Sequence, residues 1–296
     1  TIDLLVQNGS LTSSVVDGVG DLRGNTVILA VTGAASTIGT STAAPLEIDA
    51  VALLNASTAG GNIFLRDISG NLPVGAVSAA GGTVDLHAAF GAITDANGAA
   101  NNVSANNLAL RASTGIGAGD PLETAVSQLA AVTVTGNIEV VNSVGGLLTV
   151  GTVNGLAGVN VTGASGEVKI VNTGALTVAQ NSSAADRIGF TALDTASAGD
   201  NFTLNAGATI TSNSADIVLN AGDNAAINGN LTAATTISVA VDAGSVDPGV
   251  GGSLTIASNS VIVAPGGATV TGQSDGDSFT LPPQHGAEQN VEGNNP

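Results

Sequence analysis

The residues of this sequence that could do chemistry are few, and most of them are carboxylates. Asp275 and Asp277 flank Gly276 near the end of the chain. Because Ca²⁺ binds several carboxylate and carbonyl oxygens at once, this spacing resembles part of a calcium loop. The glycine- and aspartate-rich repeat of calcium-binding solenoids is missing, however. Looser acidic pairs lie at Asp216 and Asp223 and at Asp242 and Asp247. We therefore expect acidic turns and no cofactor, with Ca²⁺ at Asp275 and Asp277 as the one candidate ion.

The sequence offers little material for catalysis. His87 and His285 are its two histidines, so a Ser-His-Asp triad would have to use one of them as its base. His285 lies in a tail rich in Pro and Gly. Enzymes that act on polysaccharides hold sugars with cations and aromatic rings, whereas this chain has 5 Lys and Arg and no Trp or Tyr. We expect a protein that is not an enzyme.

Three basic or titratable side chains occupy equivalent places in three short apolar segments. Arg66, His87 and Arg111 each come directly after a leucine that ends such a segment. If these segments are neighbouring strands of a parallel stack, the three side chains point outward about 4.8 Å apart. They then form an outward basic stripe, which either relieves repulsion among carboxylates or contacts an acidic neighbour.

Composition narrows the class of protein. The formal net charge is −18, yet 43% of the residues are hydrophobic and the mean hydropathy is +0.39, which argues against a disordered acidic chain. Five cations and 2% aromatic residues exclude a nucleic-acid-binding surface. The absence of Cys excludes a disulfide scaffold. Because no run approaches about 20 apolar residues, we expect no membrane span.

The elements that would position these side chains are short strands. Short segments with an apolar–x–apolar core recur along the chain, for example at 27–29, 63–65, 108–110 and 217–219. Gly, Asn, Asp, Ser and Thr separate them, which predicts strands joined by turns. A spacing near 20 residues favours an all-β, right-handed parallel β-helix (β-solenoid) with coils of about 20 residues over a β-sandwich. Within residues 141–187 the sequence does not show where each coil begins.

A larger repeat lies above the coil. The motifs Ile-Gly, Pro-Leu-Glu and Gly-Asn-Ile follow one another in residues 37–77 and again in 115–153, which indicates a duplicated module of several coils. Residues 120–123 have the pattern of a helix start, but the first copy alternates at 46–50, so we expect strands in both copies. The solenoid is expected to span 1–272, with a polar Pro- and Gly-containing tail or linker at 273–296.

Asn residues recur at the ends of the expected strands. Val-Asn occurs at 141–142 and 171–172, and Leu-Asn-Ala-Gly occurs at 204–207 and 219–222. Asn tolerates the left-handed conformation that a corner needs, and stacked copies can form a hydrogen-bonded ladder. We expect both roles here.

The module carries a resemblance. Together with the segment Gly146-Leu147-Leu148-Thr149-Val150 it resembles the repeats of giant haemagglutinin-like, β-strand-repeat surface proteins of bacteria, and residues 275–281 resemble linker repeats of the same extracellular giants. The resemblance implies a right-handed parallel β-helix that is secreted, extracellular or at the cell surface, with a structural or adhesive role. It transfers no catalytic residue.

We therefore expect an extracellular structural protein whose solenoid subunits assemble end to end into a fibre, sheath or surface layer. The alternative is the stalk or binding section of a large surface adhesin, and a polysaccharide-acting enzyme comes third. Ile2, Leu4 and Val6 form an apolar strand with no polar cap before it, and Val270 lies in the last expected coil. The expected partners are head-to-tail copies of the chain and, beyond them, cell-surface carbohydrate or other matrix proteins.

Overall fold

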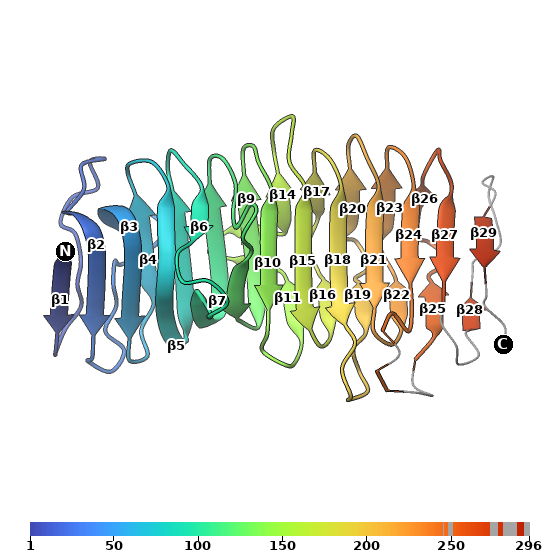
Figure 1. Cartoon of the computed structure of the whole chain (residues 1–296), viewed down its shortest axis with the longest axis horizontal. Coiled ribbons are helices and arrows are strands. Elements are labelled where there is room, and N and C mark those ends of the chain that lie inside the picture. The colour runs from blue at the N-terminus through green and yellow to red at the C-terminus, as the bar shows by residue number, and fades with distance from the viewer. Residues whose placement is uncertain (245, 248–250, 273–277, 281–288, 293–296) are drawn as a thin grey trace. The chain divides into compact units, whose positions relative to one another are not determined.

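The computed structural model describes residues 1–296 apart from 245, 248–250, 273–277, 281–288 and 293–296. The described residues form strands and no helix (Figure 1). They divide into two compact units, the first comprising 1–141 with 152–156 and the second comprising 142–151 with 157–296. Each unit is a parallel β-solenoid, which confirms the all-β fold class.

The strands of the first unit stack in parallel ladders, except that β12 and β13 form a separate two-stranded sheet. β10 and β13 each extend into the second unit by one residue. These strands are β1 (Ile2–Val6), β2 (Leu22–Val31), β3 (Leu46–Thr58), β4 (Ile63–Asp67), β5 (Leu72–Ala88), β6 (Ile93–Asp95), β7 (Val103–Ala112), β8 (Leu122–Ala125), β9 (Gln128–Thr133), β10 (Ile138–Asn142), β12 (Thr152–Val153) and β13 (Leu156–Ala157).

The second unit repeats three strands in each coil. Its strands are β11 (Leu148–Val150), β14 (Val159–Val161), β15 (Val168–Thr173), β16 (Leu176–Val178), β17 (Ser182–Ala184), β18 (Ile188–Leu193), β19 (Phe202–Leu204), β20 (Thr209–Ser212), β21 (Ile217–Ala221), β22 (Ala225–Ile227), β23 (Asn230–Ala233), β24 (Ile237–Ala240), β25 (Ser253–Ile256), β26 (Ile262–Val263), β27 (Ala268–Thr271), β28 (Ser278–Thr280) and β29 (Gln289–Glu292). One ladder runs β15-β18-β21-β24-β27, a second runs β16-β19-β22-β25 and a third runs β17-β20-β23-β26.

The interior of each solenoid is a stack of aliphatic side chains. In β2, Val27, Leu29 and Val31 are buried, and Leu54 and Ala56 of β3 lie directly on the first two of them. Burying one such side chain fully contributes about 1.5–3 kcal/mol. Small and β-branched residues suit this narrow interior, which explains why so few aromatic residues are needed.

The coil length varies because the corners differ in length. Val168 pairs with Ile188, a separation that matches the coil length predicted from the sequence. Ile237, by contrast, pairs with Ala268 in a clearly longer coil, because a corner at 241–252 separates β24 from β25. The repeated Leu-Asn-Ala-Gly segments do not stack, since Leu204 pairs with Ile227 in a different ladder. The two copies of this segment therefore lie on different faces of the solenoid, and the interpretation of them as stacked copies is wrong.

Asn side chains connect the coils where the strands end. The Asn142 amide donates to Asn172 Oδ1 at 2.7 Å, and both side chains are buried, which confirms the expected ladder. The expected left-handed backbone is wrong for these two residues. Among the described residues, Asn154 is the one Asn with positive φ, at 49°, and it begins the tight turn between β12 and β13.

The two copies of the module share backbone contacts. Ile38 N donates to Asn62 O at 3.0 Å, and Ile116 N donates to Asn137 O at 2.8 Å. Leu46 begins β3 and Leu122 begins β8, so the expectation of strands rather than a helix is confirmed at both places.

Two segments of the expected tail are strands. In parallel register, β28 pairs with β25 and β29 pairs with β27. Val270 therefore does not lie in the last strand of its ladder, because it pairs with Val291. The rest of 273–296 lies outside the described residues.

None of the described residues forms a helix with the length and apolarity needed to cross a lipid bilayer.

The Gly of the Ile-Gly motif provides a test of this packing. Gly39 and Gly70 have nearly the same φ, +69° and +68°, so Ala at either position meets the same left-handed strain of about 1–2 kcal/mol. A Cβ at Gly39 would lie 2.3 Å from the carbonyl oxygen of Phe64, whereas a Cβ at Gly70 meets nothing within 4 Å. We expect Gly39→Ala to lower the free energy of unfolding, measured by chemical denaturation, clearly more than Gly70→Ala. Equal losses would contradict the close approach of the two coils.

Candidate functional site

The expected basic stripe lies on one ladder of the first unit. Arg66 of β4 pairs with His87 of β5, and His87 pairs with Arg111 of β7. Their side chains are only partly exposed. Arg66 Nη1 lies 2.7 Å from Glu47 Oε1, and Arg111 forms an ion pair with Asp85. Both arginines therefore contact acidic neighbours within their own unit.

Glu47 is the anchor of the first of these pairs. It is 0% exposed, and its second oxygen accepts the backbone N–H groups of Asp17 at 3.0 Å and Gly18 at 2.9 Å. Charge-assisted bonds to a buried carboxylate are strong, and the removal of one partner is costly. Arg66 thus stabilises a carboxylate that ties the 12–21 segment to β3.

Asp85 has a similar set of partners. Besides Arg111, it accepts hydrogen bonds from Thr42 Oγ1 at 2.7 Å and from Asn154 Nδ2 at 2.9 Å. Arg111 also donates to the carbonyl oxygen of Asn154 at 3.1 Å. Beside these groups is a small pocket, whose lining includes Thr42, Phe64, Arg66, Asp85, His87 and Arg111. The charges that line it are already compensated.

His87 stands between the two arginines. Burial lowers the pKa of its imidazole below the usual value, and the positive charges of Arg66 and Arg111 lower it further. The imidazole is neutral at neutral pH, which allows the two guanidinium groups to stack one coil to either side of it. This arrangement supports a structural role for His87.

Asp67, at the end of β4, is a buried carboxyl with an unusual pKa. Burial raises its pKa to about 6, although the N–H groups of Ser69 and Ala50 donate to it at 2.8 Å and 3.1 Å and oppose the shift. The folded protein therefore takes up this proton near pH 6, whereas the unfolded chain takes it up near the ordinary pKa of 3.8.

We expect Asp67 to make the first unit more stable in mild acid. Its contribution is fully present below about pH 4 and is lost as the pH rises through about 6. One pKa unit corresponds to about 1.4 kcal/mol, so the change between pH 4 and pH 7 is about 2–3 kcal/mol. The difference in unfolding free energy between the wild type and Asp67→Asn should shrink by that amount from pH 4 to pH 7. A difference independent of pH would contradict the account, and the exposed Asp120→Asn is the charge-matched control.

The expected assembly residues Ile2, Leu4 and Val6 all lie on one side of β1. They pair with Val27, Leu29 and Val31, which are buried, so they sit on the end of the apolar interior of the first unit. Their own side chains are half-buried. In the described residues, the hydrogen-bonded partner of β1 is β2, and Figure 1 shows β1 at the outer edge of its ladder.

A cluster of carboxylates occupies one corner of the second unit. Three connecting segments of successive coils form this corner: 194–201 between β18 and β19, 222–224 between β21 and β22, and 241–252 between β24 and β25. Because these strands stack in register, the three corners lie one above another. The acidic residues that they bring together are Asp194, Asp200, Asp223, Asp242 and Asp247.

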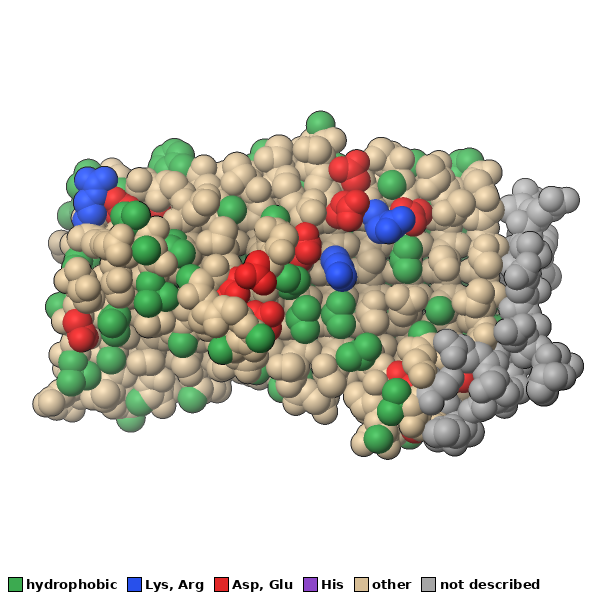
Figure 2. Space-filling model, in the orientation of Figure 1, with side chains coloured by type: hydrophobic (Ala, Val, Ile, Leu, Met, Phe, Trp, Pro, Cys, Tyr) green, Lys and Arg blue, Asp and Glu red, His purple; other side chains and the backbone are tan. Residues whose placement is uncertain are grey.

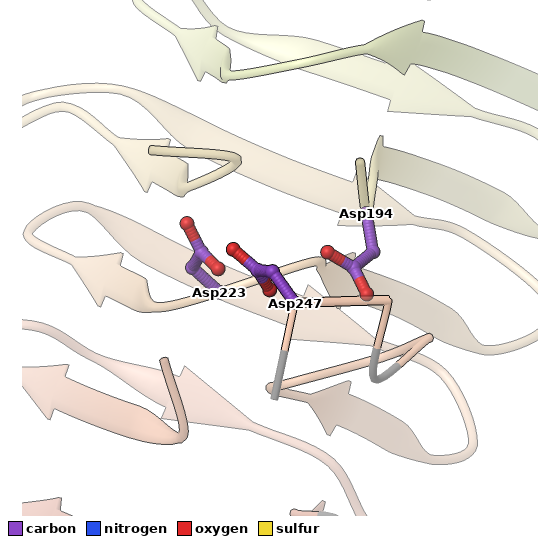
Figure 3. Close-up of side chains that lie close together, drawn as sticks. All are labelled: Asp194, Asp223 and Asp247. Carbon is purple, nitrogen blue, oxygen red and sulfur yellow. The ribbon is translucent and has the colours of Figure 1, made fainter. Parts of the chain in front are cut away.

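Three of these side chains converge. One carboxylate oxygen from each of Asp194, Asp223 and Asp247 lies within 4.8 Å of the other two. Figure 3 shows the three carboxylates gathered at one place, although they come from three successive coils. Asp194 and Asp223 are buried, and Asp247 is half-buried. The pKa of Asp247 is raised by desolvation and by the charges of Asp223, Asp194 and Asp200.

Backbone donors hold the two buried carboxylates in place. Asp223 Oδ2 accepts the N–H groups of Gly199 and Asp200, the latter at 2.8 Å. Asp194 Oδ2 accepts the N–H of Val246, which lies far along the chain in the 241–252 corner. Val246, which follows β24, therefore lies against Asp194, which follows β18 two coils earlier.

Glycine permits this close approach. A Cβ on Gly222 would lie 2.6 Å from the Cα of Asp194, and a Cβ on Gly244 would lie 2.6 Å from the Cβ of Asp194. Gly244 also has a φ of +149°, which side chains rarely adopt. Larger residues at these positions would push the corners apart.

Sequence reasoning found this cluster only in fragments. It paired Asp242 with Asp247 and Asp216 with Asp223, but Asp216 instead contacts Arg187 at 2.9 Å. It missed Asp194 altogether. The available signal was that an Asp comes one or two residues after an alternating strand in successive coils. The metal candidates Asp275 and Asp277 lie outside the described residues.

Comparisons of the chain with protein-family models, with curated proteins and with solved structures found no match.

Proposed function

We propose that this chain is an extracellular structural protein whose solenoid coils extend from one copy to the next, head to tail, in a fibre, sheath or surface layer. The observation that carries the proposal is the row Ile2, Leu4 and Val6, which continues a buried apolar stack onto a half-exposed strand. Among the described residues β1 pairs with β2, and a strand at the edge of a ladder can accept another strand through its backbone N–H and C=O groups.

Strand addition at this edge would repeat what every coil inside the unit already does. A second copy would supply parallel main-chain hydrogen bonds and an apolar coil face that covers Leu4 and its neighbours. Contacts of this head-to-tail kind are heterologous, so they propagate unless the geometry closes them into a ring.

The surface supports a structural role rather than a catalytic one. The face shown in Figure 2 carries few charged side chains, gathered in small groups on a mostly uncharged surface. The pocket at His87 has its charges already paired within the unit. The repeat resemblance to haemagglutinin-like surface proteins of bacteria is part of this proposal, as is the extracellular or cell-surface location.

The second candidate is a stalk or binding section of a large adhesin. The duplicated Ile-Gly module favours it, because repetition of coils builds length without adding a binding site. A stalk differs from a fibre subunit in one measurable respect, since it has no need to polymerise. Carbohydrate or matrix proteins would then be the partners of other regions.

Two adjacent leucines test the assembly proposal. Leu4 lies on the apolar row, whereas Leu5 is 59% exposed on the other side of the same strand. We expect the full chain to form filaments, visible by electron microscopy and by concentration-dependent light scattering. Leu4→Lys should suppress them because it places a charge on the coil face, and Leu5→Lys should not.

Circular dichroism and thermal melting of both variants would show that each remains folded. A wild-type chain that stays monomeric at high concentration would rule out the fibre and leave the stalk. Equal suppression by both lysine substitutions would show that added charge, and not the apolar row, controls assembly.

A further inference from the structure

We propose that the corner of the second unit that contains Asp194, Asp223 and Asp247 is a binding site for one Ca²⁺ ion. The site differs from the pair Asp275 and Asp277 that the sequence indicated. It is also independent of end-to-end assembly, since it lies within one unit and uses none of the β1 residues.

The strongest support is a set of buried oxygens that lack partners. Asp223 is 1% exposed and Asp194 is 7% exposed, yet Oδ1 of each has no hydrogen-bond partner among the described residues. Both oxygens of Asp247 are in the same condition. A buried carboxylate oxygen without a donor is costly, so these four oxygens favour a positively charged ligand.

The two buried carboxylates are also oriented in a way that suits an ion. In each, Oδ2 is occupied by backbone N–H groups, which leaves Oδ1 as the free ligand atom. The backbone of neighbouring coils fixes these side chains before any ion arrives. Such preorganisation lowers the entropy lost on binding.

No ion pair among the described residues includes Asp194, Asp223 or Asp247. The ion pairs there join Arg23 to Asp49, Arg66 to Glu47, Arg111 to Asp85 and Arg187 to Asp216. In the first unit, the buried acids Glu47, Asp49 and Asp85 each pair with an arginine, and the buried Asp67 accepts two backbone N–H groups. The corner is therefore the place where an external cation has most to neutralise.

The donor set favours a hard cation. All the free ligand atoms are carboxylate oxygens, which suit Ca²⁺ and Mg²⁺ and not the softer metals that prefer His or Cys. Mg²⁺ demands a near-ideal octahedron, whereas Ca²⁺ accepts six to eight oxygens in irregular geometry. Side chains from three different coils make an irregular set, and water or loop carbonyl groups would complete the shell.

Binding at this place would fasten the 241–252 corner across the coils. Asp247 lies on that corner, while Asp194 and Asp223 belong to the two preceding corners. Without a cation the three carboxylates repel one another, and this repulsion destabilises the corner. With Ca²⁺ bound, the same three side chains connect three coils.

Asp247→Asn is the most informative variant, because the Asp247 carboxylate has no hydrogen bond among the described residues that the substitution would break. We expect isothermal titration calorimetry of the chelator-treated full chain to show one Ca²⁺ site for the wild type. Asp247→Asn and Asp223→Asn should each weaken Ca²⁺ binding at least tenfold. Asp120→Asn, which removes an exposed carboxylate in the first unit, should leave the affinity unchanged.

Thermal melting supplies a readout that a purely structural role would not produce. In chelator, Asp247→Asn should melt at or above the wild-type temperature, because it removes repulsion. In Ca²⁺ it should melt below the wild type, because it lacks a ligand, so the order of the two proteins reverses. The absence of a saturable site, an equal effect of Asp120→Asn, or the same order in both conditions would overturn the proposal. An equal affinity for Mg²⁺ would overturn the assignment to Ca²⁺.

Discussion

In-register parallel stacking is the constraint on which the rest of this structure depends. Each residue of a coil lies directly against its counterpart in the next coil. Every side chain therefore has either a similar or a complementary side chain about 4.8 Å away. Aliphatic side chains benefit from such repetition, as Val27 on Leu54 shows. Asn residues benefit as well, because the amide of Asn142 bonds to that of Asn172. Ionised side chains do not, and the two units treat them in different ways.

In the first unit, acidic side chains are paired with arginines. Glu47 pairs in register with Arg66, and neutral His87 separates Arg66 from Arg111. Along this ladder an acid, a base, a neutral ring and a second base follow one another, and Glu47 is held by Arg66 and by backbone donors. At the acidic corner of the second unit, stacking brings Asp194, Asp223 and Asp247 together with backbone donors but with no base from the described part of the chain. The same stacking rule that stabilises the interior creates there a concentration of negative charge that a cation can relieve.

The sequence predicted the coil stack but not its corners. Alternation at Ile217–Leu219 is a local property, so strands could be predicted without knowing what they pair with. The equivalence of Arg66, His87 and Arg111 could also be predicted, because each follows a leucine near the end of an apolar strand. Which strands stack depends on corner length, and the short corner at 222–224 and the long corner at 241–252 follow no local period. Asp194 and Asp247 are therefore neighbours in space although whole coils of sequence separate them, a relation that no local pattern contains.

The proposed site requires that stacked corners bring three carboxylates from three coils to one cation. Anomalous diffraction from crystals of the full chain grown with Ca²⁺, measured at long wavelength, tests both halves of that requirement at once. We predict one strong anomalous peak about 2.3–2.6 Å from carboxylate oxygens of Asp194, Asp223 and Asp247. A map in which these three side chains are apart, or in which they are together with no peak between them, would contradict it.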